Sequence, residues 1–145
     1  KSTLMRALAG LARVFSGEVA RAPGLTLGWQ DQHPVRLPEM PLTGREYLRF
    51  AGARRVPPAR ITDWMGRRVD TLSGGQLQLL AVWAALGSDA DLVLLDEPTN
   101  NLDPEGEDML VEFLGHGHGH RGALVVSHER AFLERACGRT VEMGP

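Results

Sequence analysis

The chain has 145 residues, of which 43% are hydrophobic and 23% are charged, and its formal net charge is −2. This length suits about one domain, and the charge gives no global electrostatic argument for binding nucleic acid or an anionic membrane. A single cysteine, Cys137, excludes an internal disulfide, and the densest apolar stretch, residues 77–87, is shorter than the roughly 20 residues that a membrane span needs.

The first part of the chain is expected to be mainly helical. Apolar residues recur at helical spacing, or follow a helix-start signal, in four segments. These segments cover residues 4–15, 43–50, 61–65 and 73–86. Between the first two, residues 25–29 predict a short strand, and residues 30–41 predict a loop because they are rich in proline and polar residues.

The second part predicts buried strands separated by helices. The aliphatic run "DLVLLDE", residues 91–97, suits a parallel strand buried on both faces, and "GALVVSH", residues 122–128, predicts a second one. Pro104 suits the first position of the intervening helix, with Asp103 as its cap. A further helix to residue 136 and a last strand at residues 140–143 complete the prediction, which is a parallel α/β sheet.

Two carboxylates follow directly after the aliphatic run, in "LVLLDEPTNNLD". A strand that ends in Asp96 and Glu97 delivers both acids to the carboxyl edge of the sheet, where α/β folds bind ligands. One carboxylate can hold Mg²⁺, and the next can polarise an attacking water. The alternative is a strand that ends in a solvated acidic turn.

The segment "LSGGQ", residues 72–76, has two interpretations. Ser73 and Gln76 have the spacing of a helix capping box. Gly74 and Gly75, however, each cost a helix about 1 kcal/mol relative to alanine. Their use would be close approach of the backbone to a ligand, and a helix N-terminus can bind an anion. The segment therefore predicts either a plain cap or a phosphate clamp.

Three further residue patterns complete the candidate set. The opening "KST" matches the end of the phosphate-loop motif G-x-x-x-x-G-K-[ST]. His128 stands just beyond the second predicted strand, and Gln32 stands in the loop after residues 25–29. Taken singly, each has an ordinary alternative: a chance dipeptide, a strand-end histidine and a solvent-facing loop glutamine.

Taken in order, these motifs resemble the nucleotide-binding domain of the ATP-binding cassette (ABC) family over essentially the whole chain. The resemblance implies a P-loop NTPase parallel sheet core at residues 1–32 and 88–145. A short helical subdomain at about residues 33–87 would carry the LSGGQ signature, and residues 1–145 would form a single, partial domain. The glycines of the phosphate loop, or Walker A loop, would lie upstream of residue 1, so the chain is expected to be truncated within that loop.

The resemblance also implies ATP and Mg²⁺ as cofactors and assigns each motif residue a role. Glu97 would be the general base, His128 would contact the γ-phosphate, and Gln32 would sense the metal and the water, with Gln30 as the other candidate glutamine. The Mg²⁺ ligands would be Ser2, Gln32 and Asp96. The nucleotide-binding residues would be Lys1, Ser2, Thr3, Ser73, Gly74, Gly75, Gln76 and Asp103.

In this family the active site is shared between two subunits. Ser73 and Gly75 would bind the γ-phosphate held by the opposite protomer of a head-to-tail dimer. The resemblance favours an ATPase subunit that energises a membrane transporter, peripheral at the cytoplasmic face of the membrane and joined to a permease. "LGWQDQHPVRLPEMPLT", residues 27–43, is similar to zinc and manganese importers, so metal import is one interpretation and no direct contact with nucleic acid is expected.

Two alternatives remain open. "DEPTNNLD" and "SHERAFLERA" look like the ABC-F class of soluble factors that act on ribosomes, and a truncated cassette that hydrolyses nothing is the other alternative. The chain also departs from the family pattern, because Leu79 and Ala84 stand where arginines are usual. The tract "HGHGH", residues 116–120, is either a zinc site or a glycine-rich loop.

Overall fold

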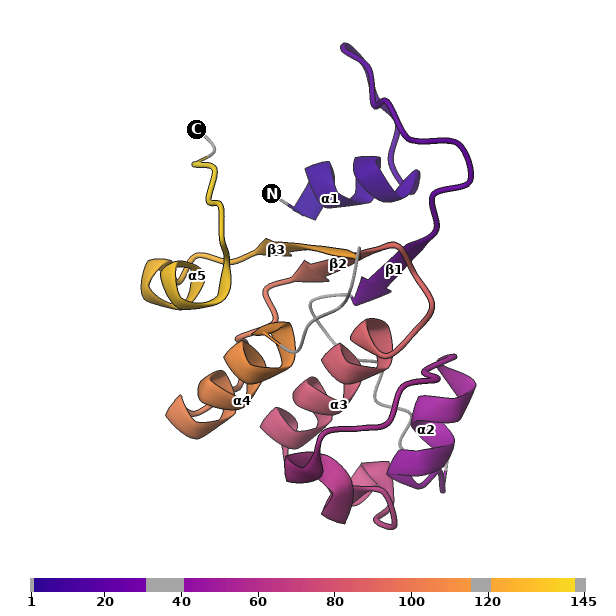
Figure 1. Cartoon of the computed structure of the whole chain (residues 1–145), viewed down its shortest axis with the longest axis vertical. Coiled ribbons are helices and arrows are strands. Elements are labelled where there is room, and N and C mark those ends of the chain that lie inside the picture. The colour runs from indigo at the N-terminus through magenta and orange to yellow at the C-terminus, as the bar shows by residue number, and fades with distance from the viewer. Residues whose placement is uncertain (1, 31–40, 116–120, 143–145) are drawn as a thin grey trace.

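The computed structural model describes residues 2–30, 41–115 and 121–142. At its centre lies a three-stranded parallel sheet in the order β1-β2-β3. The strands are β1 (Leu27–Gln30), β2 (Leu92–Asp96) and β3 (Gly122–Val126). Helices cover both faces of this sheet: α1 packs against β2 on one face, and α3 and α4 lie on the other (Figure 1). The predicted parallel α/β architecture is therefore confirmed.

Five α-helices and two short 3₁₀ helices make up the helical elements of the described residues. The α-helices are α1 (Ser2–Ala9), α2 (Gly44–Phe50), α3 (Gly74–Leu86), α4 (Pro104–Gly115) and α5 (Arg130–Ala136). The 3₁₀ helices are Ala59–Trp64 and Val69–Thr71. Most bounds match the sequence prediction, but residues 61–65 belong mainly to a 3₁₀ helix, and residues 140–142 form no strand. The expected boundaries of a helical subdomain, residues 33–87, stay a prediction.

The first helix is shorter than its apolar pattern predicted. It ends at Ala9, and Gly10 follows with φ +78°, a left-handed conformation that glycine adopts without the steric cost of a side chain. Leu11 and Phe15 consequently lie outside the helix and are 68% and 89% exposed. The residue that α1 buries is Met5.

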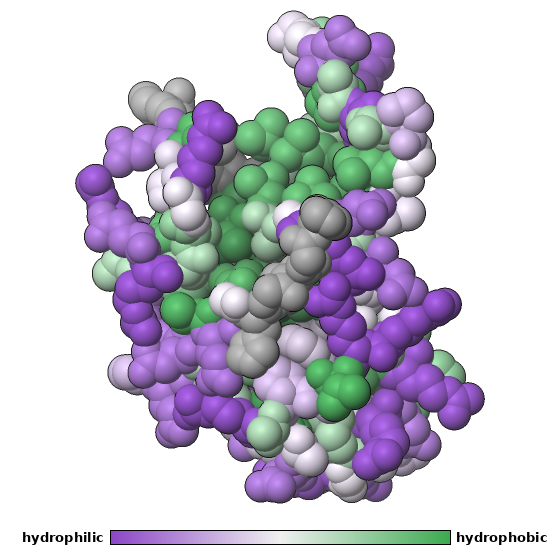
Figure 2. Space-filling view, viewed as in Figure 1, coloured by the Kyte–Doolittle hydropathy of each residue, from purple (hydrophilic) through white to green (hydrophobic). Residues whose placement is uncertain are grey.

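Strand β3 is not the buried strand that the sequence predicted. Residues 122–124 are exposed, and Leu124 is 38% exposed, whereas Leu94 and Leu95 of β2 are fully buried. The reason is packing, since β2 lies between two strands and contacts α1 and α3, whereas β3 lies at the edge of the described sheet and packs mainly on β2. Hydrophobic side chains gather over this part of the molecule in Figure 2.

Helix α3 is mainly apolar from Leu77 to Leu86 because other elements surround it. All ten residues from Leu77 to Leu86 are buried, and the helix packs against α2, α4 and β1. The Trp83 ring meets Phe113 of α4 edge to face, with centroids 5.5 Å apart. Leu79 and Ala84 are both buried, so apolar residues suit these two positions. The departure from the family pattern therefore fits the packing.

Within the part of the chain that the structure describes, no helix has the length and apolar character that crossing a membrane requires.

Candidate functional site

The carboxylates after β2 lie where the sequence placed them. Asp96 is the last residue of the strand and is 1% exposed. Its Oδ1 atom has no hydrogen-bond partner among the described residues. A buried carboxylate oxygen without a partner is costly, and this arrangement suits an oxygen that binds a cation.

The side chain of Glu97 lies against His128. The Nδ1 atom of His128 is 2.9 Å from Oε2 of Glu97, and the backbone N–H of His128 donates to the same oxygen at 3.3 Å. Strand pairing brings the two residues together, since the N–H of Glu97 donates to the carbonyl of Val126 at 2.8 Å. The Glu97 side chain is 14% exposed and the His128 side chain 67%. A carboxylate held in this way can accept a proton from a water at the site.

The turn at residues 97–103 begins with Glu97, whose backbone is in a strained conformation. Glu97 has φ 48°, which costs a glutamate residue roughly 1–2 kcal/mol. Asn101 has φ 63°, a conformation that asparagine adopts more readily. Hydrogen bonds stabilise the turn: the N–H of Asn100 donates to the carbonyl of Glu97 at 3.2 Å, and the Thr99 and Ser127 hydroxyls lie 3.5 Å apart. Such strain is typical of positions that orient a functional side chain.

Asp103 caps α4, as the sequence predicted. Its Oδ1 atom accepts the backbone N–H of Gly106 at 2.8 Å. This oxygen therefore already has a partner within the chain, and the expected role of Asp103 as a nucleotide-binding residue stays a prediction.

The LSGGQ segment forms the start of α3 and contains the predicted capping box. The Ser73 hydroxyl accepts the N–H of Gln76, and the Gln76 side chain accepts the N–H of Ser73, both at 3.1 Å. Gly75 has a role that the sequence did not reveal. A Cβ atom on Gly75 would lie 2.9 Å from the carbonyl oxygen of Asn101, so the first turn of α3 packs directly on the turn that carries Glu97.

The remaining predicted residues lie at the edges of the described chain. Ser2 is half-buried and Thr3 exposed in the first turn of α1, and Figure 1 shows that this end of α1 points to the side of the sheet where β2 and β3 end. Gln30 is buried at the end of β1. Lys1, Gln32 and the tract 116–120 lie outside the described residues.

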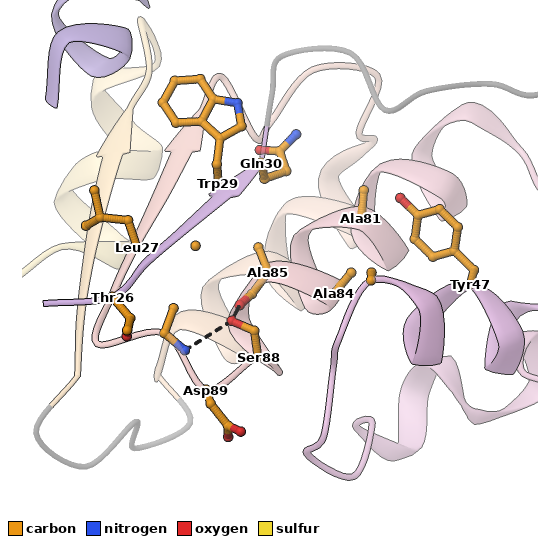
Figure 3. A pocket seen from close by; sticks show the side chains of 13 residues that line it. Thr26, Leu27, Trp29, Gln30, Tyr47, Ala81, Ala84, Ala85, Ser88 and Asp89 are labelled. Atoms are coloured by element: carbon orange, nitrogen blue, oxygen red, sulfur yellow. Dashed lines mark hydrogen bonds between the residues drawn. The ribbon is translucent and has the colours of Figure 1, made fainter. Parts of the chain in front are cut away.

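A groove of about 660 Å³ lies between β1, α2 and α3 (Figure 3). One wall carries Tyr47 of α2, a second is the strand β1, and the floor consists of small residues of α3, whereas the Trp29 ring points away from these small residues (Figure 3). These small residues are Ala81, Ala84 and Ala85. Burial raises the pKa of the Tyr47 hydroxyl, so this wall stays uncharged over a wide pH range. Polar side chains, among them Thr26, Ser88 and Asp89, also line the groove. No cluster of three metal-ligating side chains occurs in the described ranges 2–30, 41–115 and 121–142.

Comparison with known proteins identifies the family. The family model described as "ABC transporter" matches residues 1–100. The chain belongs to the ABC transporter family. The parallel sheet with helices on both faces is the α/β fold of its solved relatives, and this ABC domain matches the archaeal ribosome recycling factor aABCE1, solved in complex with the ribosomal stalk protein aP1. That match has a TM-score of 0.78 and 28% identity, over 94% of this chain and 28% of the other.

Curated relatives of this ABC domain include proteins of two kinds. The zinc import ATP-binding protein ZnuC of Paracoccus denitrificans (strain Pd 1222) is 36% identical, over 97% of this chain and 59% of the relative. An ATP-binding cassette sub-family F member 3 homolog of Encephalitozoon cuniculi (strain GB-M1) is 35% identical, over 94% of this chain and 25% of the relative. The chain thus spans less than two thirds of the length of these relatives.

Proposed function

We propose that this chain is part of an ATPase subunit that binds and hydrolyses ATP to energise a membrane transporter. The observation that carries this proposal is the Glu97–His128 pair beside the buried Asp96, at the carboxyl end of β2. In this role Glu97 orients a water and accepts its proton, while His128 holds one oxygen of the carboxylate and keeps the other directed at the water. The exposed face of His128 is then free to approach the terminal phosphate.

Asp96 is the expected Mg²⁺ residue, together with Ser2 and Gln32. The donor chemistry fits, because Mg²⁺ prefers carboxylate, hydroxyl and amide oxygens, and Asp96 offers a buried oxygen without a partner among the described residues. Bound Mg²⁺ would neutralise phosphate charge. Lys1 and Thr3 are the expected phosphate contacts.

The LSGGQ segment is proposed to serve the nucleotide of a second subunit in a head-to-tail dimer. Ser73 and Gln76 satisfy each other as a cap. An α-helix leaves its first N–H groups without an intrahelical acceptor, and here these belong to Gly74 and Gly75. They are therefore the donors that can meet a phosphate, with Asp103 contributing from the neighbouring turn.

The transporter interpretation is supported by the groove as well as by the zinc import relative. We infer that the groove receives an apolar helix of a permease, which places the subunit at the cytoplasmic face of the membrane, with a metal ion as the transported substrate.

The second candidate is a soluble factor that acts on ribosomes, favoured by the sub-family F relative and by the likeness to a ribosome recycling factor. Sedimentation of the tagged protein with membranes or with ribosomes decides between them. A cassette without hydrolysis is the third candidate, and the preserved Asp96, Glu97 and His128 argue against it.

The test of ATP hydrolysis is Glu97→Gln in a polypeptide that carries a glycine-rich phosphate loop ahead of Lys1. Glutamine keeps the shape but cannot accept the proton, so the turnover is expected to fall about 10²- to 10⁴-fold while ATP binding persists. Glu134→Gln, an exposed change on α5, is the matched control. Near-normal hydrolysis by the Glu97 variant would remove this residue from the proposed role.

A further inference from the structure

One polar side chain interrupts the buried stretch of α3. Gln78 is 0% exposed and is flanked by the buried Leu77 and Leu79. Its Nε2 atom donates to the carbonyl of Pro98 at 3.3 Å, and its Oε1 atom has no hydrogen-bond partner among the described residues. Burying an amide that is only half satisfied is unfavourable. An apolar residue of similar size would suit the local packing better, so packing alone does not explain this glutamine.

The acceptor of this hydrogen bond stands next to the proposed catalytic glutamate. Pro98 directly follows Glu97, whose backbone has φ 48°. A strained conformation persists where its surroundings hold it in place. Strand β3 holds one side of Glu97, through the Val126 carbonyl and His128. Gln78 approaches the turn from α3 and holds the carbonyl of Pro98, the residue that follows Glu97.

We propose that Gln78 is a positioning residue for Glu97. Its amide N–H fixes the Pro98 carbonyl, which holds the preceding residue in the left-handed conformation that aims the Glu97 carboxylate at His128. Gln78 itself does not touch the reacting atoms. This inference rests on the proposed ATP hydrolysis and adds a residue from α3 to the machinery at the end of β2.

The test compares Gln78→Met with Leu80→Met, in the polypeptide that carries a glycine-rich loop ahead of Lys1. Both changes place methionine at a fully buried position of α3, but only the first removes a hydrogen bond to the turn. Misplacing a catalytic group by about 1 Å can cost a factor of about 10² in rate. We therefore expect Gln78→Met to lower kcat roughly 10- to 100-fold with an unchanged KM for ATP and an unchanged melting temperature, and Leu80→Met to leave kcat intact.

Two further measurements separate positioning from a structural role. In the Glu97→Gln background, Gln78→Met should lower the residual rate no further, because it acts through the glutamate. Hydrogen exchange should be faster at the backbone amides of Glu97 and Asn100 in Gln78→Met than in Leu80→Met. If the wild-type protein hydrolyses no ATP, the proposed function fails, and the exchange experiment still decides the inference. Normal kcat in Gln78→Met, or exchange equal to that of the control, would overturn it.

Discussion

Replacing Gly75 by alanine tests whether this glycine serves the fold or only a ligand. The new Cβ atom would lie 2.9 Å from the Asn101 carbonyl oxygen and 3.6 Å from Cδ2 of Leu102. The backbone oxygen cannot turn aside as a flexible side chain can, so the turn or the helix must move by several tenths of an ångström. Overpacking of this kind costs about 1–3 kcal/mol. Helix propensity returns at most about 1 kcal/mol.

The expected result is a net loss of about 1–2 kcal/mol in the free energy of unfolding, or roughly 3–7 °C in melting temperature at this chain length. Circular dichroism without nucleotide measures it. Gly115→Ala, at the end of α4, is the control, because none of the described atoms lies within 4 Å of its Cβ position. If Gly75→Ala is as stable as the wild type without nucleotide, the contact with Asn101 does not constrain the fold, and the glycine is there for a ligand.

Three further predictions concern the cap of α3, the packing of Phe113 in the core, and the contact between Thr26 and Asp91. Ser73→Ala should lower stability by about 1 kcal/mol and Ser73→Thr by less, in urea unfolding without nucleotide, because only threonine keeps the capping hydroxyl. Phe113→Ala should lower the free energy of unfolding by about 3–5 kcal/mol, since the ring is fully buried against Trp83; a loss below 1 kcal/mol would contradict this packing. The hydroxyl and the N–H of Thr26 donate to Asp91 and hold the pKa of its carboxyl below the usual 3.8. The stability advantage of the wild type over Asp91→Asn should therefore be fully present above pH 4 and shrink as the pH falls through the lowered pKa, as urea midpoints at pH 7 and pH 3 would show.

Local signals in the sequence were sufficient for most of the elements. The capping residues Thr43 and Ser73 each begin a helix at the predicted position, because a cap depends on residues within one turn of each other. The aliphatic run that ends at Asp96 forms the predicted strand. The acidic pair after this strand was predictable in the same way, since the order of residues along a parallel strand decides which of them reach its carboxyl end.

Exposure was harder to predict than element type. An aliphatic run looks the same in the sequence whether or not its neighbours cover it, so β3 was expected to be as buried as β2 and is not. The first helix was predicted to continue through Leu11 and Phe15, but it ends at Ala9. Helical spacing continues past Gly10, and only the backbone conformation of that glycine shows where the helix ends.

The sequence by itself determined the order of most elements, the caps of α3 and α4, and the chemical groups available at the end of β2. The tertiary structure alone decided which of these groups meet. Glu97 contacts His128 across 31 positions of the chain, and Gln78 contacts Pro98 across 20. Gly75 packs on the Asn101 carbonyl. The physical reason is that these contacts join segments far apart in the chain, and strand register and helix packing set their geometry, whereas the patterns read from a sequence report only on neighbours within a few residues.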